Sequence, residues 1–290
     1  MYQEKPVKPL KDLNLLDRFL FAEAMEDTVV CTNMLEIILG SNNITLLDKI
    51  QTEKELRTSP LLRSVRVDVW AMDEQGTIYN SEMQGYKRGN LRKRSRYYQA
   101  LLDSGLLEPG VVDFDILNDS FMIFISPFGV FGLKKYLYTF QMRCDEESEL
   151  ALGDGAVRIF LNTNGNNKED ISQELVELLG YIEHSTDTFA QKCTSSKVRE
   201  IHEHICRIKM SEKIGVKYMN AWEEKIIIRE EGKAEGITEV IIDLLRDYGD
   251  IPQDLREKIK TEDNINVLKE WLKKAIKTGS MEQFQKAIQS

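Results

Sequence analysis

Two acidic residues, Asp68 and Glu82, lie on the two sides of a segment whose pattern predicts a β-hairpin. Residues 66–72 and 77–84 are rich in β-branched and aromatic side chains and alternate as strands do. Two carboxylates on adjacent strands could bind a divalent cation, because Mg²⁺ and Ca²⁺ prefer oxygen ligands. The alternative is that both residues are ordinary solvated charges on the exposed face of a sheet.

The chemistry of the turn predicts how the two strands pair. Its three-residue loop, residues 74–76, ends in glycine, which supplies the left-handed position of a bulged hairpin turn. Closing this loop pairs Asp73 with Thr77, and the same register places Asp68 opposite Glu82. Side chains directly across a strand pair lie about 4.5–5.5 Å apart, where like charges repel each other. A divalent cation between the two carboxylates is the simplest compensation.

A strongly basic segment follows the hairpin. Residues 85–98 contain six Lys or Arg residues and no acidic one, which leaves 33 basic against 48 acidic residues in the rest of the chain. We expect a helix over residues 88–104 whose arginines, beginning with Arg88, recur at four-residue spacing along one face. The residues expected to hold the phosphate backbone of DNA are Lys87, Arg92 and Arg96. The alternative is a solvated amphipathic helix, and in either case its apolar stripe would be Leu91, Tyr98, Leu101 and Leu102.

The order of these features resembles the PD-(D/E)XK nuclease superfamily. More narrowly, it resembles the branch described as PD-(D/E)XK family transposases, or recombination-promoting nucleases, of bacteria and their mobile elements. The likeness runs from about residue 13 to about residue 165. The segments that carry it are residues 16–21, 65–69, 82–84, 93–98, 138–140, 152–155 and 159–163.

The resemblance implies a fold and a chemistry. The fold would be α/β (α+β), a restriction-endonuclease-like mixed-sheet core flanked by helices, and the activity would be Mg²⁺-dependent hydrolysis of DNA, with Mn²⁺ as a substitute ion. The metal ligands would be Asp68, Glu82 and the backbone carbonyl of Met83. Gln84 would take the place of the usual lysine as the third catalytic residue, a form common in this branch. Because glutamine is neutral, one alternative stays open: a catalytically weak or inactive nucleic-acid-binding or regulatory protein that keeps the fold.

Glu36, on the first expected helix, is a candidate for an extra acidic ligand, since the superfamily sometimes takes one from that helix. The competing interpretation is a solvated helix charge.

Composition narrows the class of protein. The 290 residues are 42% hydrophobic and 30% charged, and their net charge of −9 disfavours DNA binding by the whole surface. Four scattered cysteines without a C-x-x-C pair favour a reduced, cytoplasmic compartment and argue against both a zinc ribbon and a disulfide framework. The first six residues do not have the apolar core of a signal peptide, and no segment has the roughly 18–20 apolar residues of a membrane span. We therefore expect no membrane partner, and the DNA that the resemblance implies would have to bind locally, at the basic helix.

The chain is expected to have three parts: a nuclease-like core over residues 1–165, a helical extension over 166–236, and a small helical module over 237–290. The module could dock a second copy of the chain or another protein. Gly232 and Gly236 predict a weakened helix or hinge. In the core, a helical segment is expected over residues 13–39, and strands are expected over residues 44–56, 120–126, 136–142 and 157–161.

One cluster of metal-binding residue types lies near residue 204. On a helix, His202 and Cys206 share a face, whereas His204 points about 200° away from His202. These residues alone therefore cannot form a three-ligand zinc site.

Overall fold

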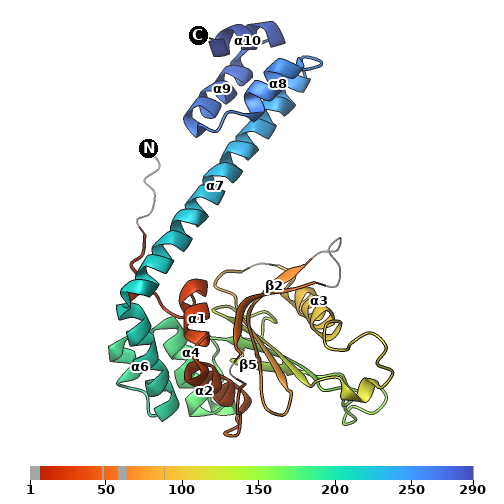
Figure 1. Ribbon diagram of the computed structural model, residues 1–290, viewed down its shortest axis with the longest axis vertical. Helices are drawn as coiled ribbons and strands as arrows, with labels where there is room; N and C mark the ends of the chain where they lie inside the picture. Colours follow the sequence, from red (N-terminus) through yellow and green to blue (C-terminus); the bar gives the residue numbers. More distant parts are fainter. Residues whose placement is uncertain (1–6, 48, 58–63, 88, 290) are drawn as a thin grey trace. The chain divides into compact units, whose positions relative to one another are not determined.

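The computed structural model describes residues 7–47, 49–57, 64–87 and 89–289 (Figure 1). By its internal contacts the chain forms two compact units, Met1–Gly215 and Val216–Ser290. Residues 166–215 therefore belong to the same unit as the sheet. The expected boundaries after residues 165 and 236 remain predictions about which parts fold independently.

The first unit contains a sheet and most of the helices. In chain order its elements are η1 (Leu10–Asp12), α1 (Arg18–Met25), α2 (Thr28–Leu39), β1 (Gln51–Leu56), β2 (Val65–Met72), β3 (Ile78–Met83), α3 (Leu91–Asp103), η2 (Phe114–Ile116), β4 (Ser120–Ser126), β5 (Leu137–Phe140), β6 (Ala156–Asn162), η3 (Lys168–Asp170), α4 (Gln173–Glu183), α5 (Asp187–Ala190) and α6 (Ser196–Met210).

The sheet is mixed, as expected. Its six strands lie in the order β1-β2-β3-β4-β6-β5. The pairs β3–β4 and β4–β6 are parallel, and the other neighbours are antiparallel. Helix α3 lies on one side of the sheet, and α1, α2, α4 and α6 pack together on the other (Figure 1). This arrangement confirms the predicted α/β fold with helices that flank a mixed sheet.

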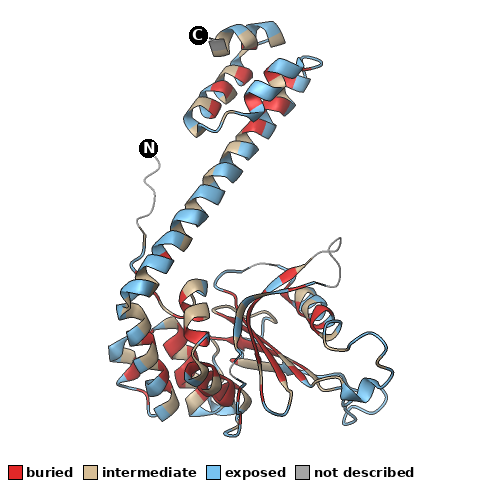
Figure 2. Cartoon of the chain, viewed as in Figure 1, coloured by how far each residue is buried: buried red, intermediate tan, exposed pale blue. Residues whose placement is uncertain are grey.

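Helix α3 covers an apolar core on its side of the sheet. Leu91, Leu101 and Leu102 of α3 pack with buried side chains of the central strands, among them Ile78 and Phe124. Buried residues gather along the sheet and on the helix faces turned towards it (Figure 2). The core therefore fixes which face of α3 looks inward.

The predicted hairpin register is confirmed. Val69 pairs with Ser81 and Met72 with Ile78, which is the register that places Asp73 against Thr77. The N–H of Asp73 donates to the carbonyl of Thr77 at 3.1 Å. Gly76 has φ +83°, the left-handed conformation that the turn requires.

Two other expected elements are divided or only partly formed. The single helical segment over residues 13–39 is two helices, because Asp27 caps α2 through hydrogen bonds from the N–H groups of Val29 and Val30. Asp17 caps α1 in the same way. In the described part of the expected strand over residues 44–56, which leaves out residue 48, only β1 is regular, and Leu46 makes an isolated bridge.

The second unit is helical. Its elements are the greater part of α7 (Glu212–Arg246), α8 (Gln253–Lys260), α9 (Ile265–Lys277) and α10 (Met281–Gln289). A separate apolar core joins the end of α7 to the three short helices, with Trp271 and Phe284 among its buried residues. Helix α7 is unbroken at Gly232 and Gly236, so the predicted weakness does not show as a break. Within the described ranges, no helix is long and apolar enough to span a bilayer.

Candidate active site

The two carboxylates named from the hairpin face each other where the β2–β3 ladder ends. Asp68 and Glu82 are only 4% and 5% exposed. The N–H of Asp68 donates to Oε1 of Glu82 at 2.9 Å, and the N–H of Met83 donates to Oδ2 of Asp68 at 2.9 Å. Beyond the last backbone pair of the ladder, each carboxylate thus accepts a hydrogen bond from a backbone N–H of the other strand. Because both acids are buried, the alternative that they are ordinary solvated charges is wrong.

Burial and mutual repulsion make this pair hard to ionise. Burial, followed by the neighbouring charge of Asp68, raises the pKa of Glu82 to about 8. Burial also raises the pKa of Asp68, although the Arg18 guanidinium opposes that shift. A cation placed between the carboxylates would favour their charged forms.

Two arginines, Arg18 of α1 and Arg66 of β2, line the cavity on the Asp68 side. Arg18, the first residue of α1, forms an ion pair with Oδ1 of Asp68. Nη2 of Arg18 also lies 3.8 Å from Oε1 of Glu53 in β1. Oε2 of Glu53 in turn lies 3.0 Å from Nη1 of Arg66. Glu53 has φ +53°, an uncommon backbone conformation for a residue with a side chain. A third carboxylate and two arginines therefore surround the Asp68 side of the site.

Gln84 has its amide held from two directions. Arg94 of α3 donates to its Oε1, and its Nε2 donates to the carbonyl of Tyr86 at 3.0 Å. The N–H of Gln84 also continues the ladder to the carbonyl of Ile125 at 2.8 Å. The guanidinium of Arg94 lies 5.5 Å from the ring centre of Tyr98, which supports it from the same helix.

These groups line one small cavity. Its volume is about 110 Å³, and a water needs only about 10–15 Å³ of such space. A cation with several of its waters therefore fits. The lining residues are Arg18, Arg66, Asp68, Glu82, Met83, Gln84, Gly85, Tyr86, Arg94 and Tyr98.

The basic residues named from helical spacing lie outside this cavity. Lys87 and Arg96 are exposed. Arg92 is also exposed, lies 6.0 Å from the ring centre of Phe131, and lines a second cavity. Arg88 falls outside the described residues. The structure therefore places Lys87, Arg92 and Arg96 on the surface and does not bring them to the carboxylates.

Glu36 has partners elsewhere. It is a buried residue of α2, its Oε2 lies 2.7 Å from Nζ of Lys197, and its Oε1 accepts from the N–H of Ile44 at 3.3 Å. The structure does not bring Glu36 to the cavity that holds Asp68 and Glu82.

Sequence reasoning missed Arg94, although a signal for it was present. Arg94 lies three residues after Leu91 and four before Tyr98, so it belongs to the inward face of α3. The four-residue repeat of arginines selected the solvent face of the helix instead. Arg18 carried no comparable signal, because its role depends on how α1 packs against β2.

A comparison with known families finds a match over most of the chain. A family model described as a PD-(D/E)XK nuclease family transposase matches residues 16–227, a span that holds every residue lining the cavity. Searches among curated proteins and among solved structures find no match. The match covers most of the chain, and the protein belongs to the PD-(D/E)XK nuclease family of transposases.

Proposed function

We propose that the protein is a metal-dependent DNA endonuclease that hydrolyses phosphodiester bonds during recombination or transposition. One observation carries the proposal: two buried carboxylates share a cavity with three arginines, Arg18, Arg66 and Arg94. Buried carboxylates with raised pKa values bind cations well once they ionise, and arginines attract phosphate. A phosphodiester bound together with a metal ion supplies the positive charge for the carboxylates and the negative charge for the arginines.

Asp68, Glu82 and the backbone carbonyl of Met83 would hold one or two Mg²⁺ ions, with Mn²⁺ as a substitute. The donors fit this ion, since all are hard oxygen atoms in a cavity with room for retained waters. Among the described residues, the hydrogen bonds to Glu82 use only Oε1, so Oε2 keeps its lone pairs. When bound, Mg²⁺ would lower the pKa of a coordinated water and offset charge on the phosphate.

Gln84 would orient the attacking water. Its Oε1 has a second lone pair beyond the bond from Arg94, and its Nε2 has a second hydrogen beyond the bond to Tyr86. The amide is neutral, so Arg94 would supply the positive charge that a lysine supplies elsewhere in the superfamily.

The exposed cations would bind the DNA strand outside the cavity. Lys87, Arg92 and Arg96 would contact successive phosphates and set the position of the strand without reading its sequence. This role suits exposed side chains better than buried ones.

The second unit would provide a docking surface for another copy of the chain or another protein. Ile227 and Ile228 of α7, two adjacent apolar side chains, are 58% and 59% exposed and would contribute to such a surface. All four cysteines are free, which fits a reducing, cytoplasmic compartment.

A second candidate is a DNA-binding protein with little or no catalysis. The engagement of Gln84 favours it, because both ends of the amide already have protein partners. Such a protein would bind DNA through its surface cations and would not require the carboxylates.

The deciding experiment is cleavage of supercoiled plasmid with Mg²⁺, with Mn²⁺ and with EDTA. The variants are Asp68→Asn and Glu82→Gln, and the matched control is Glu74→Gln at the exposed tip of the same hairpin. We expect metal-dependent nicking that both site variants lose and the control keeps. Retained DNA binding without cleavage in any metal would support the second candidate. Cleavage at the wild-type rate by either site variant would refute the assignment of the site.

A further inference from the structure

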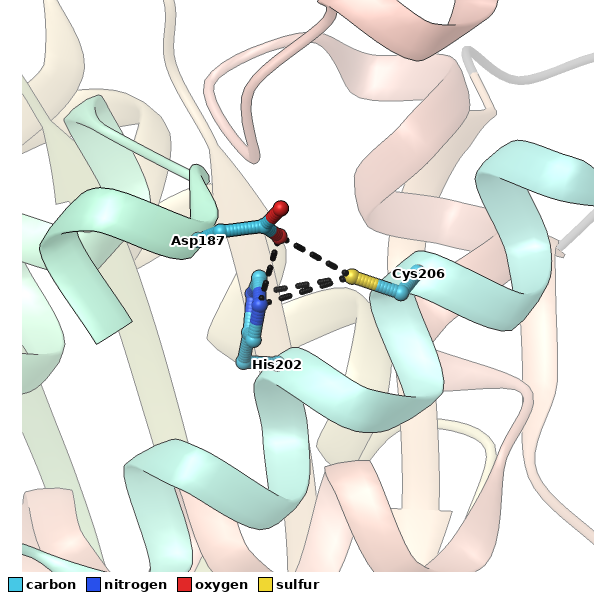
Figure 3. A group of neighbouring side chains, drawn as sticks. All are labelled: Asp187, His202 and Cys206. Atoms are coloured by element: carbon cyan, nitrogen blue, oxygen red, sulfur yellow. Dashed lines mark hydrogen bonds and ion pairs between the residues drawn. The ribbon is translucent and has the colours of Figure 1, made fainter. Parts of the chain in front are cut away.

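Three side chains of different kinds converge in the helical layer of the first unit (Figure 3). Asp187 opens α5, and His202 and Cys206 lie one turn apart on α6. Oδ1 of Asp187 lies 3.0 Å from Nε2 of His202. Sγ of Cys206 lies 3.4 Å from the same nitrogen and 3.7 Å from Oδ1. We propose that these three groups bind a Zn²⁺ ion, in a site separate from the carboxylate cavity.

The distances between the donors match a tetrahedral zinc centre. Zinc bonds of about 2.0–2.1 Å to nitrogen and oxygen and about 2.3 Å to sulfur place N and O about 3.3 Å apart, and sulfur about 3.6 Å from either. The observed separations are 3.0, 3.4 and 3.7 Å. Sγ also lies 3.8 Å from Nδ1 of the same ring, so the side chain of Cys206 would have to turn towards the Nε2 edge of the ring to seat the ion.

The surroundings of His202 fit the role of a metal ligand. Its Nδ1 lies 2.9 Å from the hydroxyl of Tyr181, a fully buried residue. A metal-bound histidine commonly has its other nitrogen held in this way, which fixes the ring and its tautomer. Here Nδ1–H would donate to the tyrosine oxygen, and the lone pair of Nε2 would face the ion.

The same three residues do not form a nucleophilic relay. A relay needs the acid on one ring nitrogen and the nucleophile on the other. Here Asp187 and Cys206 both approach Nε2 most closely. Burial, followed by the charge of Asp187, also raises the pKa of the Cys206 thiol, which makes it a poor nucleophile. Donors that meet at one point serve chelation.

The identity of the donors separates this site from the one at Asp68. One thiolate, one imidazole and one carboxylate favour zinc over the harder Mg²⁺. Binding would displace the thiol proton of Cys206, and the ion would tie α5 to α6. The side chain of Asp187 is 77% exposed, so the ion can enter from solvent, and a water could complete the tetrahedron.

The test uses the full chain without an affinity tag, freed of metal and titrated with Co²⁺ in excess Mg²⁺. We expect one Co²⁺ per chain, with the sulfur-to-cobalt charge-transfer band of a thiolate ligand, and displacement by Zn²⁺. Cys206→Ser should abolish the band. Asp187→Asn should weaken Zn²⁺ binding by at least about tenfold, because loss of even an outer partner costs about 10–100-fold. Asp187 is exposed, so this variant should fold normally.

A cysteine and a histidine outside the proposed site serve as controls. Cys144 donates to Glu146 at 3.2 Å, which makes it a cysteine beside a carboxylate, and His204 on α6 pairs with Asp27. Cys144→Ser and His204→Asn should leave the band and the affinity unchanged. No Zn²⁺ binding, a band that survives Cys206→Ser, or full affinity in Asp187→Asn would each overturn the proposal. Asp68→Asn should bind Zn²⁺ as the wild type does, so this test stands apart from the nuclease assay.

Discussion

The backbone N–H of Asp68 donates to the side chain of Glu82 at 2.9 Å, across the end of the β2–β3 ladder. The position of one carboxylate therefore depends on the backbone that carries the other. Any change that alters the hairpin register would separate them, because a slip of one residue turns every side chain to the opposite face. The site is thus built into the hairpin, and α1 and α3 add its positive charges.

The pKa of Glu82 predicts how stability depends on pH. Its folded value is about 8, against about 4.3 in an unfolded chain. Between these values the native state binds the extra proton, so the free energy of unfolding of metal-free protein should fall as pH rises. The slope contributed by this group is at most about 1.4 kcal/mol per pH unit. Urea unfolding in EDTA across this range measures it.

Glu82→Gln should flatten this decline, and Glu74→Gln, at an exposed position, should not. Mg²⁺ requires the ionised carboxylate, so the stabilisation that it provides should grow with pH over the same interval. An equal pH dependence in wild type and Glu82→Gln would contradict the raised pKa.

Arg94 and Arg96 provide a matched pair, since only the first reaches the cavity. Arg94→Ala should lower the cleavage rate by roughly 10²-fold, as expected when one preorganised donor to a developing charge is lost. Arg94→Lys should restore part of the rate. Arg96→Ala should instead weaken DNA binding and reduce the slope of its salt dependence by about 1. Rates measured at saturating DNA, and affinities measured at several salt concentrations, separate the two effects. Identical effects of the two alanine variants would contradict this division of roles.

Gly76 should resist substitution, whereas Gly232 should not. Gly76 has φ +83°, and an added Cβ would lie 3.1 Å from the side-chain nitrogen Nδ2 of Asn118. Gly76→Ala should therefore lower stability by about 1–2 kcal/mol. Gly232 lies inside α7 with no atom within 4 Å of an added Cβ, so Gly232→Ala should stabilise the second unit by up to about 1 kcal/mol. Thermal unfolding of both variants tests the opposite signs. A shift of the same sign in both would contradict the turn geometry.

Local chemistry explains which parts of the structure the sequence predicts. The register of the hairpin depends on one loop, residues 74–76, so the facing of Asp68 and Glu82 could be worked out from turn chemistry alone. The position of Glu53, which contacts Arg18 and Arg66, could not be worked out in this way, because it depends on the pairing of β1 with β2. The inward position of Arg94 could also have been predicted, since the apolar positions of α3 define the inward face of that helix.

The complete cluster at His202 could not be predicted from the sequence. The third donor, Asp187, lies on a different helix, α5, and no spacing rule relates its position to α6. The i, i+4 pair on α6 was visible in the sequence, and so was the divergence of His204. Only the packing of α5 against α6 brings the carboxylate to the pair.

Arg18 should have opposite effects on metal binding and on cleavage. Its guanidinium is paired with Asp68 and is about half exposed, so it can turn towards a phosphate when a metal ion binds the carboxylate. Arg18→Ala removes a positive charge that repels Mg²⁺, so Mg²⁺ should bind at least as tightly as in the wild type. The cleavage rate should nevertheless fall by roughly tenfold or more, because one cation near the reacting phosphate is lost. Isothermal titration with Mg²⁺ and single-turnover cleavage of plasmid measure the two quantities separately. Weaker Mg²⁺ binding with an unchanged rate would show that Arg18 only holds Asp68 in place.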